Sequence, residues 1–425
     1  MRAVSFYGFG GSYAVGLKNT GITLDGIIEP GGFGLPVVLA NKEYLNFDGF
    51  VIKDIPSYEQ ALEIAKLQPE MVMGNPPCSG FSAMNQTKGQ VTSRGPKSSI
   101  NQCMWDLVEF AAIVQPKVVV FESVPAAYTL GYSLMLDLFE FLKERSGRHW
   151  YLQLVLMSGA SVGNAQRRHR FFWVASQEPI GVIIPDIQRV NTIFDAIGDL
   201  VKTPLSDELQ TIVLPHEPSP YAYKLYNDDL LIDGHISRDH IRVDELYQWA
   251  RPGWSQRECL EQIKKEKAFG EYWTEARVNK YLASVSFSGP YRIHRDGLSR
   301  VISGEGANSF IHYELDRLLT IREAARLMGF PDDFSWGQQT GSFSQRNTWM
   351  GKQVPVQSWT WMLESLKRSL QGEKNLWYGN VVADDIRVLD ITQDYKKVFH
   401  ERRREQGVDS RSKEWIKHME SRVLS

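Results

Sequence analysis

The chain has 425 residues, of which 43% are hydrophobic and 23% charged. This balance is typical of soluble globular proteins and excludes collagen-like, wholly disordered and disulfide-scaffold classes. The three cysteines, Cys78, Cys103 and Cys259, are too few and too scattered for a disulfide framework or a zinc cluster. They indicate a reducing compartment, in which any one of them is free to act as a nucleophile.

The charge and hydropathy of the chain limit its partners. The net charge of −2 gives no sign of a nucleic-acid partner, so such a site must come from local clustering of charge. No apolar run approaches the ~18 residues that a membrane span needs. Glycines also interrupt the first residues too early for a signal peptide. We therefore expect no membrane partner and no metal.

The first 175 residues alternate strand-length apolar runs with segments of helical periodicity. This alternation predicts an α/β fold with a mostly parallel sheet covered on both faces. The predicted strands are Ala3–Phe6, Gly26–Ile28, Glu70–Met73, Lys117–Phe121, Leu152–Met157 and Arg170–Ala175, and the predicted helices between them are Tyr58–Lys66, Asn101–Ile113 and Ser133–Leu142.

The pattern weakens over residues 176–310, where short runs mix with Pro, Gly, Trp and Tyr. A helix is predicted again over Thr320–Met328, with Thr320 as its cap and Glu323 three residues later, and another over Val356–Leu370. After Gly372 the charges are interspersed, which is typical of a solvated helical face rather than a targeting signal.

A glycine-rich turn, Phe6-x-Gly8-x-Gly10-Gly11, follows the first predicted strand. Glycines there allow a tight turn and let a ligand lie close to the backbone. Glu29 ends the second apolar run, where an acid could bind ribose hydroxyls, and Asp54 could accept a hydrogen bond from an adenine amino group. The alternatives are a glycine turn without a ligand and, for Asp54, an ordinary loop acid.

A cysteine stands where a sheet of this kind binds its ligands. Pro76 and Pro77 fix the backbone at the end of a predicted strand, and Cys78 follows them. The stretch up to about residue 99 is rich in Gly, Ser and Thr and carries scattered cations, as a mobile lid would. A lone cysteine is more often a small buried hydrophobe, but the two prolines and the soft loop favour a nucleophile.

Two charged segments complete the candidate site. Glu122 comes just beyond the predicted strand Lys117–Phe121, which is unusual unless the carboxylate faces a site. In the extended segment 166–170, Arg168 and Arg170 share one face, while Arg167 and His169 point away. Two guanidiniums on one face need an anionic or strongly polar partner, and a structural ion pair is the alternative.

In this order and spacing, the motifs resemble those of the DNA (cytosine-5) methyltransferase family. The resemblance spans residues 1–371, leaving 176–310 and the tail unmatched. The matching blocks are Phe6-x-Gly8-x-Gly10-Gly11, Pro77-Cys78-x-x-Phe81-Ser82, Glu122-Ser123-Val124, Gln166-x-Arg168-x-Arg170, Arg317-x-Leu319-Thr320-x-Arg322-Glu323-Ala324-Ala325-Arg326-Leu327-Met328-Gly329-Phe330-Pro331-Asp332-x-Phe334 and Gly351-Lys352-Gln353-Val354-Pro355-Val356.

The resemblance implies a Rossmann-like, S-adenosylmethionine-dependent methyltransferase sheet with an inserted smaller target-recognition domain. It implies a catalytic and cofactor-binding domain over 1–175, recognition over 176–315, a return segment over 316–371 and an extension over 372–425. The recognition region holds cations and aromatic residues suited to phosphates and base edges, although an ordinary aromatic core is the alternative: Trp254, Trp273, Tyr281, Tyr291, Arg292, His294, Arg295 and Arg300.

The resemblance also implies the chemistry of the site. Cys78 would add to C6 of a cytosine flipped out of double-stranded DNA, and C5 would then accept the transferred group. Glu122 would contact N3 and the amino group, and Arg170, aided by Arg168, would hold O2. The residues implied to bind S-adenosyl-L-methionine are Phe6, Gly8, Gly10, Gly11, Glu29, Asp54, Pro76, Lys352 and Val354.

The chain departs from the family pattern at positions that bear on this chemistry. Ser123 replaces an asparagine thought to brace the cysteine loop, and one extra residue lies between Gly11 and Gly16. Lys352 replaces another asparagine near the cofactor, and a lysine beside a sulfonium needs an anion or must point away. A carboxy-S-adenosyl-L-methionine donor would bring that anion and give 5-carboxymethylcytosine, an alternative to plain methyl transfer and 5-methylcytosine.

Two other classes remain open. One is a related enzyme acting on RNA, against which the roughly 130 residues between blocks argue. The other is an inert DNA-binding relative, against which the retained Cys78, Glu122, Arg168 and Arg170 argue. The prediction is a monomeric DNA-modifying enzyme of the cytoplasm, in a prokaryotic or phage-infected cell and in the setting of restriction-modification.

Overall fold

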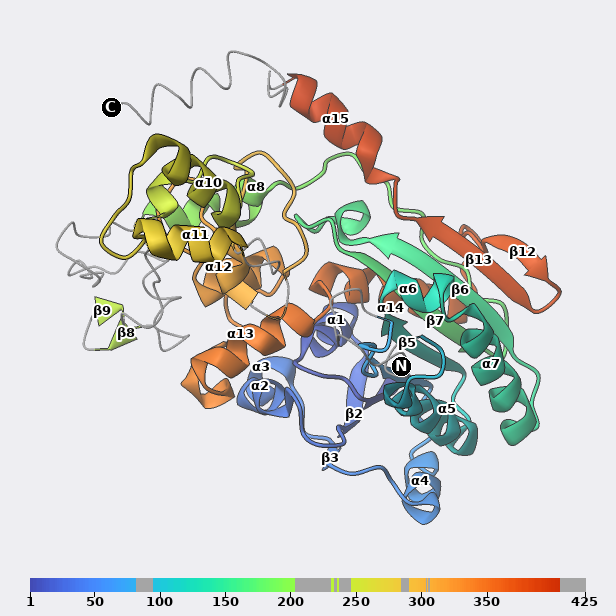
Figure 1. Ribbon diagram of the computed structural model, residues 1–425. Coiled ribbons are helices and arrows are strands. Elements are labelled where there is room, and N and C mark those ends of the chain that lie inside the picture. Colours follow the sequence, from blue (N-terminus) through green and yellow to red (C-terminus); the bar gives the residue numbers. More distant parts are fainter. Residues whose placement is uncertain are drawn as a thin grey trace.

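A nine-stranded sheet forms the centre of the computed structural model, which describes residues 1–81, 95–202, 246–283, 290–302 and 306–405 together with 231–232, 235–236 and 304 (Figure 1). The strand order is β12-β13-β6-β7-β5-β4-β1-β2-β3, and only β7 and β12 run antiparallel to their neighbours. The mostly parallel α/β sheet is therefore confirmed. The strands are β1 Arg2–Phe6, β2 Thr23–Ile28, β3 Phe50–Ile52, β4 Met71–Gly74, β5 Val118–Ser123, β6 Tyr151–Ser158, β7 His169–Ser176, β12 Asn380–Ala383 and β13 Ile386–Ile391.

Each strand predicted from the first 175 residues is present, with ends that differ by at most a few residues. One difference concerns the site. Glu122 was expected just beyond its strand but lies within β5, because pairing with β7 continues to Ser123 and places Glu122 opposite Phe172. The carboxylate is therefore carried by a paired strand rather than by a loop.

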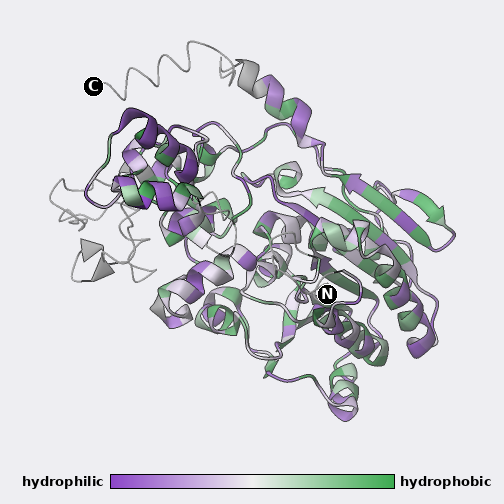
Figure 2. Ribbon diagram, in the orientation of Figure 1, coloured by the Kyte–Doolittle hydropathy of each residue, from purple (hydrophilic) through white to green (hydrophobic). Residues whose placement is uncertain are grey.

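Helices cover both faces of the sheet. Side chains alternate along β5, so that Val118 and Val120 face one hydrophobic cluster while Val119 and Phe121 face the other. Figure 2 shows hydrophobic residues along the central strands and hydrophilic ones on the outer helices, most of all around α10. Helices α1 and α14 pack on the first face and α5 and α7 on the second. The bounds are α1 Ser12–Thr20, α2 Leu35–Ala40, α3 Lys42–Leu45, α4 Tyr58–Ala65, α5 Gln102–Val114, α6 Pro125–Thr129, α7 Tyr132–Ser146 and α14 Val356–Leu370.

The segment after residue 316 returns to the sheet through α12 (Ile321–Leu327), α13 (Phe343–Lys352) and α14. The predicted cap of the first of these is confirmed, since Thr320 and Glu323 form a capping box. Glu323 is fully buried and accepts two hydrogen bonds from Arg317, at 2.7 and 2.8 Å. This bidentate pair fixes α12 against the strand pair β10 (Tyr291–Arg292) and β11 (Phe310–Ile311).

A smaller unit lies at one end of the molecule (Figure 1). It contains α10 (Gln256–Glu266) and α11 (Glu275–Ala283), which share a hydrophobic cluster with Leu246 and Trp273. The remaining short elements of this half are α8 Ile193–Ile197, β8 Leu231–Ile232 and β9 His235–Ile236.

The tail after Gly372 extends the sheet before it forms a helix. β13 pairs in parallel with β6, from Ile386 opposite Leu152 to Ile391 opposite Met157. The helix α15 (Tyr395–Glu405) follows, and it buries Tyr395 and Phe399. Among the described residues, no helix is long and apolar enough to cross a membrane.

Candidate active site

Three of the predicted catalytic residues meet at one edge of the sheet. Cys78 follows the end of β4, and Glu122 lies near the end of β5, which is the parallel neighbour of β4. Because β7 runs antiparallel to β5, its first residues, including Arg170, lie at that same edge. The strand order therefore brings together side chains that are 44 and 48 positions apart in the sequence (78 to 122, and 122 to 170).

Glu122 and Arg170 form a buried ion pair. The Oε1 atom of Glu122 lies 2.6 Å from Nε of Arg170, and their side chains are only 3% and 9% exposed. Burial raises the pKa of Glu122 above its ordinary value, although the charges of Arg170 and Arg168 oppose this. The carboxyl group is therefore more easily protonated than a carboxyl group at the surface.

Cys78 is half-buried, beside this pair. Burial raises the pKa of its thiol, and the negative charge of Glu122 raises it further, whereas Arg170 lowers it. The backbone N–H of Val124 donates a hydrogen bond to Sγ and also favours the thiolate. The thiol therefore becomes more acidic whenever Glu122 takes up a proton.

Arg168 lies near these three residues but binds backbone oxygens. Its two terminal nitrogens donate to the carbonyls of Ile302, at 2.6 Å, and Gly351, at 2.8 Å. Arg168 thus ties β7 both to the segment that follows the smaller unit and to the end of α13. The predicted alternation is confirmed here, since Arg168 and Arg170 are buried while Arg167 is exposed.

The glycine-rich turn after β1 adjoins the cysteine loop. The N–H of Asn75 donates to the carbonyl of Tyr7 at 2.8 Å, and a Cβ atom at Gly74 would lie 2.0 Å from the carbonyl oxygen of Phe6. Tyr7, Phe9 and Gly11 all have positive φ, at 58°, 55° and 99°. Such a backbone turns back sharply at the end of β1.

Glu29 and Gln353 flank this turn. Glu29 is buried, and its Oε2 accepts the N–H of Phe9 at 2.8 Å. Burial raises the pKa of Glu29 to about 8, although the N–H groups of Phe9 and Gly8 lower it. Gln353 accepts the N–H of Ser12 through Oε1 at 2.8 Å, while its Nε2 is buried and has no partner among the described residues.

Glu29 and Gln353 fit a bound methyl-group donor that carries a ribose and a carboxylate. The unpartnered Nε2 of Gln353 would lie 2.5 Å from a Cβ atom at Gly10, so it faces the backbone of the turn and can donate a hydrogen bond there. Sequence reasoning missed Gln353, although it stands in the Gly351-Lys352-Gln353-Val354 block and both of its neighbours, Lys352 and Val354, were predicted to bind the cofactor.

The other predicted donor-binding residues differ in exposure. Phe6, Pro76 and Val354 are buried, whereas Asp54 and Lys352 are exposed. Lys352 ends α13 and makes no ion pair within the described part of the chain. The predicted lid falls mostly on residues 82–94, which lie outside the described residues.

Several of the expected recognition side chains have structural roles instead. Arg292 is buried, and its guanidinium binds the carbonyls of Tyr247 and His312 as well as Asp316. Trp273 is buried in the core of the smaller unit. The exposed cations Arg251, Arg295 and Arg300 instead lie over aromatic rings, at 3.6 to 4.9 Å from the ring centroids.

The chain is similar to known DNA methyltransferases. The chain is 26% identical over 324 residues to "Type II methyltransferase M.Bpa9945I" of Bacillus paralicheniformis, covering 67% of this chain and 67% of that protein. It is 25% identical over 397 residues to "Type II methyltransferase M.AgeI" of Thalassovita gelatinovora, covering 75% and 88%. A crystal structure described as a DNA modification methyltransferase encoded within a prophage (E. coli) matches 87% of this chain and 99% of its own, with a TM-score of 0.58 and 17% identity, which shows the fold.

A family model described as "C-5 cytosine-specific DNA methylase" matches residues 40–368, which is most of the chain. This range includes the cysteine loop, both strands that carry the ion pair and all but the last residues of the return segment. The chain therefore belongs to the C-5 cytosine-specific DNA methylase family and is an enzyme of the DNA cytosine-5 methyltransferase type.

Proposed function

We propose that this enzyme transfers a methyl group from S-adenosyl-L-methionine to C5 of a cytosine flipped out of double-stranded DNA, through a covalent bond between Cys78 and C6. The observation that carries the proposal is the meeting of Cys78 with the Glu122–Arg170 ion pair at one sheet edge. A cytosine within the duplex stack cannot present C6 to a thiol, so the base must leave the helix.

Glu122 and Cys78 are suited to exchange a proton. The pKa of Glu122 is raised by burial, so its carboxyl group can take the thiol proton and then donate it in a hydrogen bond to N3 of the base. With Glu122 neutral, Arg170 and the N–H of Val124 both stabilise the thiolate. The S–C6 bond forms as the electron pair of the C5=C6 bond moves to C5.

The remaining steps restore the ring. The electron pair at C5 would bond to the methyl carbon as the bond from that carbon to the donor sulfur breaks and leaves S-adenosyl-L-homocysteine, and the proton on C5 then leaves to a base. Its bonding pair reforms the C5=C6 bond and expels the Cys78 thiolate. Arg170 would hold O2 of the base during this sequence. Arg168 would act as a positioning residue, because its terminal nitrogens already bind the carbonyls of Ile302 and Gly351.

The bound donor supplies an electrophilic methyl carbon. Glu29 would accept hydrogen bonds from its ribose, and Nε2 of Gln353 would bind its carboxylate beside Gly10. Phe6 and Val354 are buried at this end of the sheet, where they would exclude water from the donor.

The identity of the transferred group depends on Lys352. Its ammonium group is exposed and makes no ion pair with the described residues, which fits a solvated lysine and equally fits a partner for the extra carboxylate of carboxy-S-adenosyl-L-methionine. We propose methyl transfer, because the ammonium group of Lys352 is exposed and does not need a carboxylate of the methyl donor as its partner. Nucleoside mass spectrometry of DNA from cells that make the enzyme, beside a Lys352→Asn variant, separates 5-methylcytosine from 5-carboxymethylcytosine.

Trapping on a duplex that contains 5-fluorocytosine tests the proposal. Fluorine cannot leave C5 as a proton, so the wild-type enzyme should be captured covalently when the donor is present. Cys78→Ser should not be captured, and Cys259→Ser, which alters a buried cysteine of the smaller unit, should behave as wild type. Capture on RNA but not on DNA would show that the substrate is a cytosine in RNA. Binding of DNA without capture would indicate an inert relative, and either result would refute the proposal.

A further inference from the structure

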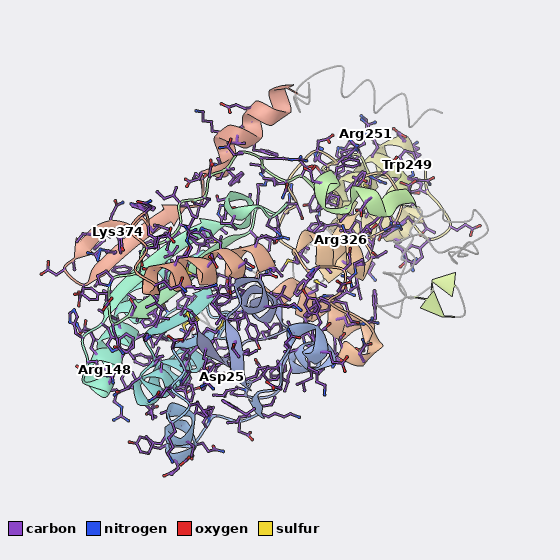
Figure 3. All side chains as sticks on the ribbon, turned by 180° about the vertical axis from the view of Figure 1, so that it is seen from behind. Asp25, Arg148, Trp249, Arg251, Arg326 and Lys374 are labelled. Atoms are coloured by element: carbon purple, nitrogen blue, oxygen red, sulfur yellow. The ribbon has the colours of Figure 1, made fainter. Side chains whose placement is uncertain are left out.

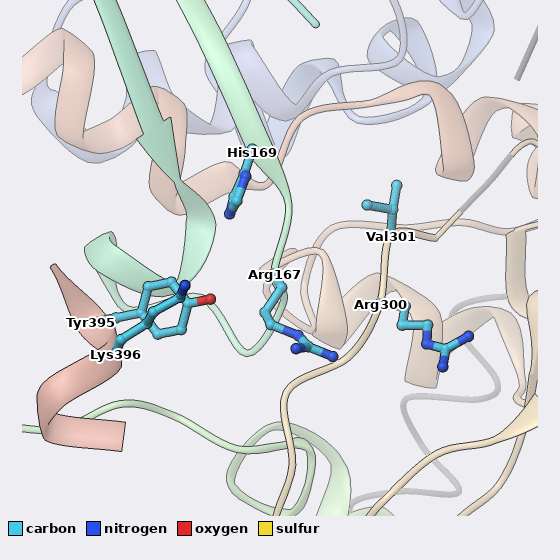
Figure 4. A pocket seen from close by; sticks show the side chains of 6 residues that line it. All are labelled: Arg167, His169, Arg300, Val301, Tyr395 and Lys396. Carbon is cyan, nitrogen blue, oxygen red and sulfur yellow. The ribbon is translucent and has the colours of Figure 1, made fainter. Parts of the chain in front are cut away.

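A cavity of about 370 Å³ lies on the other side of the segment that carries Arg168 and Arg170 (Figure 4). Its walls come from three parts of the chain: the start of β7, the segment that follows the smaller unit, and the first turn of α15. The lining residues are Arg167, His169, Arg300, Val301, Tyr395 and Lys396.

Backbone pairing holds two of its cations side by side. The N–H of Arg167 donates to the carbonyl of Ser299 at 2.9 Å, and the N–H of Ser299 donates to the carbonyl of Ala165 at 2.8 Å. Arg300 therefore comes directly after Ser299, whose backbone is hydrogen-bonded to the segment that contains Arg167. The guanidinium of Arg300 lies 4.4 Å from the centroid of the Tyr291 ring, which limits its freedom.

The tail supplies the third cation. Tyr395 and Phe399 on α15 are buried in one cluster with Leu298 and Ala160. Because Leu298 is two residues from Arg300, this packing fixes the first turn of α15, and with it Lys396, against the same cavity. Figure 4 shows Arg167 between Tyr395 and Lys396 on one side and Arg300 on the other.

The described residues do not neutralise these charges. Arg167, Arg300 and Lys396 make no ion pair in the described part of the chain. Nε2 of His169 is buried and has no hydrogen-bond partner among those residues. Asp390 is the acid that faces His169, and the N–H of Thr392 already donates to its carboxylate. A site with three cations and an unpartnered imidazole suits an anion with several acceptor oxygens.

We propose that this cavity binds a phosphate of the DNA backbone beside the flipped cytosine, so that the C-terminal tail forms part of the DNA-binding surface. The inference rests on the proposed function, because DNA must be the substrate. The position supports it: Arg167 and Arg168 are adjacent residues, so the cavity and the base pocket occupy the two faces of one short segment. A phosphate held there would fix the strand from which the base is extruded.

The salt dependence of DNA binding tests the proposal on the full-length chain. The log of the binding constant for a cytosine duplex should fall with log salt, with a slope of about −0.9 for each neutralised phosphate. Arg300→Gln and Lys396→Gln should each weaken binding severalfold at low salt and reduce the slope by about 1. The double variant should reduce the slope no further, because both cations share one phosphate.

Arg148→Gln is the matched control. Arg148 is also an exposed cation, but it follows the end of α7 and lies far from α15 and the cavity (Figure 3). Slopes for the two cavity variants that equal the slope of Arg148→Gln would overturn the proposal. A second arm titrates inorganic phosphate into the protein without DNA. Phosphate binding that both cavity variants abolish, combined with unchanged DNA slopes, would assign the cavity to a free phosphate compound and also overturn it.

The trapping experiment keeps this proposal separate from the function. Normal capture of wild-type enzyme on 5-fluorocytosine DNA, with unchanged salt slopes in the variants, would refute the phosphate site alone. Failure of capture on DNA would refute the function, whatever the slopes are.

Discussion

Replacing Glu29 with glutamine should stabilise the ligand-free enzyme at alkaline pH and weaken its binding of the donor. Glu29 is 3% exposed, and burial raises its pKa from 4.5 to about 8. One pKa unit corresponds to about 1.4 kcal/mol, so relative to acidic pH the shifted titration of Glu29 lowers the free energy of unfolding by about 3 kcal/mol at about pH 7 and by about 5 kcal/mol above pH 8.

The direction of the pH effect follows from proton binding. Between pH 4.5 and about 8, the folded state keeps a proton on Glu29 that the unfolded chain has lost. The free energy of unfolding of the wild type should therefore decline as the pH rises through this range. Glu29→Gln does not titrate and still accepts the N–H of Phe9 through its amide oxygen, so the decline should be smaller.

Thermal unfolding near pH 5 and near pH 8.5 measures this difference. The melting temperature of Glu29→Gln should exceed that of the wild type by a few degrees at the higher pH and match it at the lower. Isothermal titration should show an affinity for S-adenosyl-L-methionine about tenfold lower or more, since ribose hydroxyls bond more strongly to a carboxylate than to an amide.

Glu43→Gln, which changes an exposed acid on α3, is the control and should alter neither quantity. Wild-type and Glu29→Gln melting temperatures that run parallel between the two pH values would refute the reasoning, because the carboxyl group would then not be protonated in the fold. Unchanged donor affinity would show that Glu29 does not contact the donor.

Two further perturbations test what holds the site together. Burial opposes ionisation of Glu323, but the charge of Arg317 outweighs burial and lowers the pKa of Glu323 to about 2. The ion pair should therefore add about 3 kcal/mol to the free energy of unfolding above pH 4.5, and this contribution is lost as the pH falls towards 2. Urea unfolding at several acidic pH values should show this loss in the wild type and much less of it in Glu323→Gln; equal profiles would contradict it. Gly74→Ala would place a Cβ atom 2.0 Å from the carbonyl oxygen of Phe6, so the end of β4 must shift. Capture on 5-fluorocytosine DNA should then slow at least tenfold in a protein that still unfolds cooperatively, and normal capture would show that this contact does not position Cys78.

The sheet could be predicted because its signals are local. Apolar runs such as 70–73 and 117–121 have strand length, and both correspond to strands within a few residues. The pairing of β13 with β6 could not be predicted in this way, since it joins residues 386–391 to 152–157 across most of the chain. The strand β12 at the sheet edge has only four residues, Asn380–Ala383, all of them exposed, so its apolar run is too short to predict a strand.

The site was predictable where it depends on strand ends. Cys78, Glu122 and Arg170 follow or flank apolar runs, and parallel strands bring such positions to one edge. The contacts of Arg168 were not predictable, because they need the carbonyls of Ile302 and Gly351, which only tertiary packing brings to β7. Backbone carbonyls leave no trace in the residue types of a sequence.

Ser123 shows how the site can differ from its family without losing its geometry. The family resemblance implies an asparagine there that braces the cysteine loop, whereas the Ser123 hydroxyl is buried and has no hydrogen-bond partner among the described residues. Backbone groups do the bracing instead: Asn75 donates to the carbonyl of Tyr7, Phe81 donates to the carbonyl of Cys78, and Val124 donates to the thiol itself. The position of Sγ therefore depends on how β1, β4 and β5 end, and much less on the side chain at residue 123.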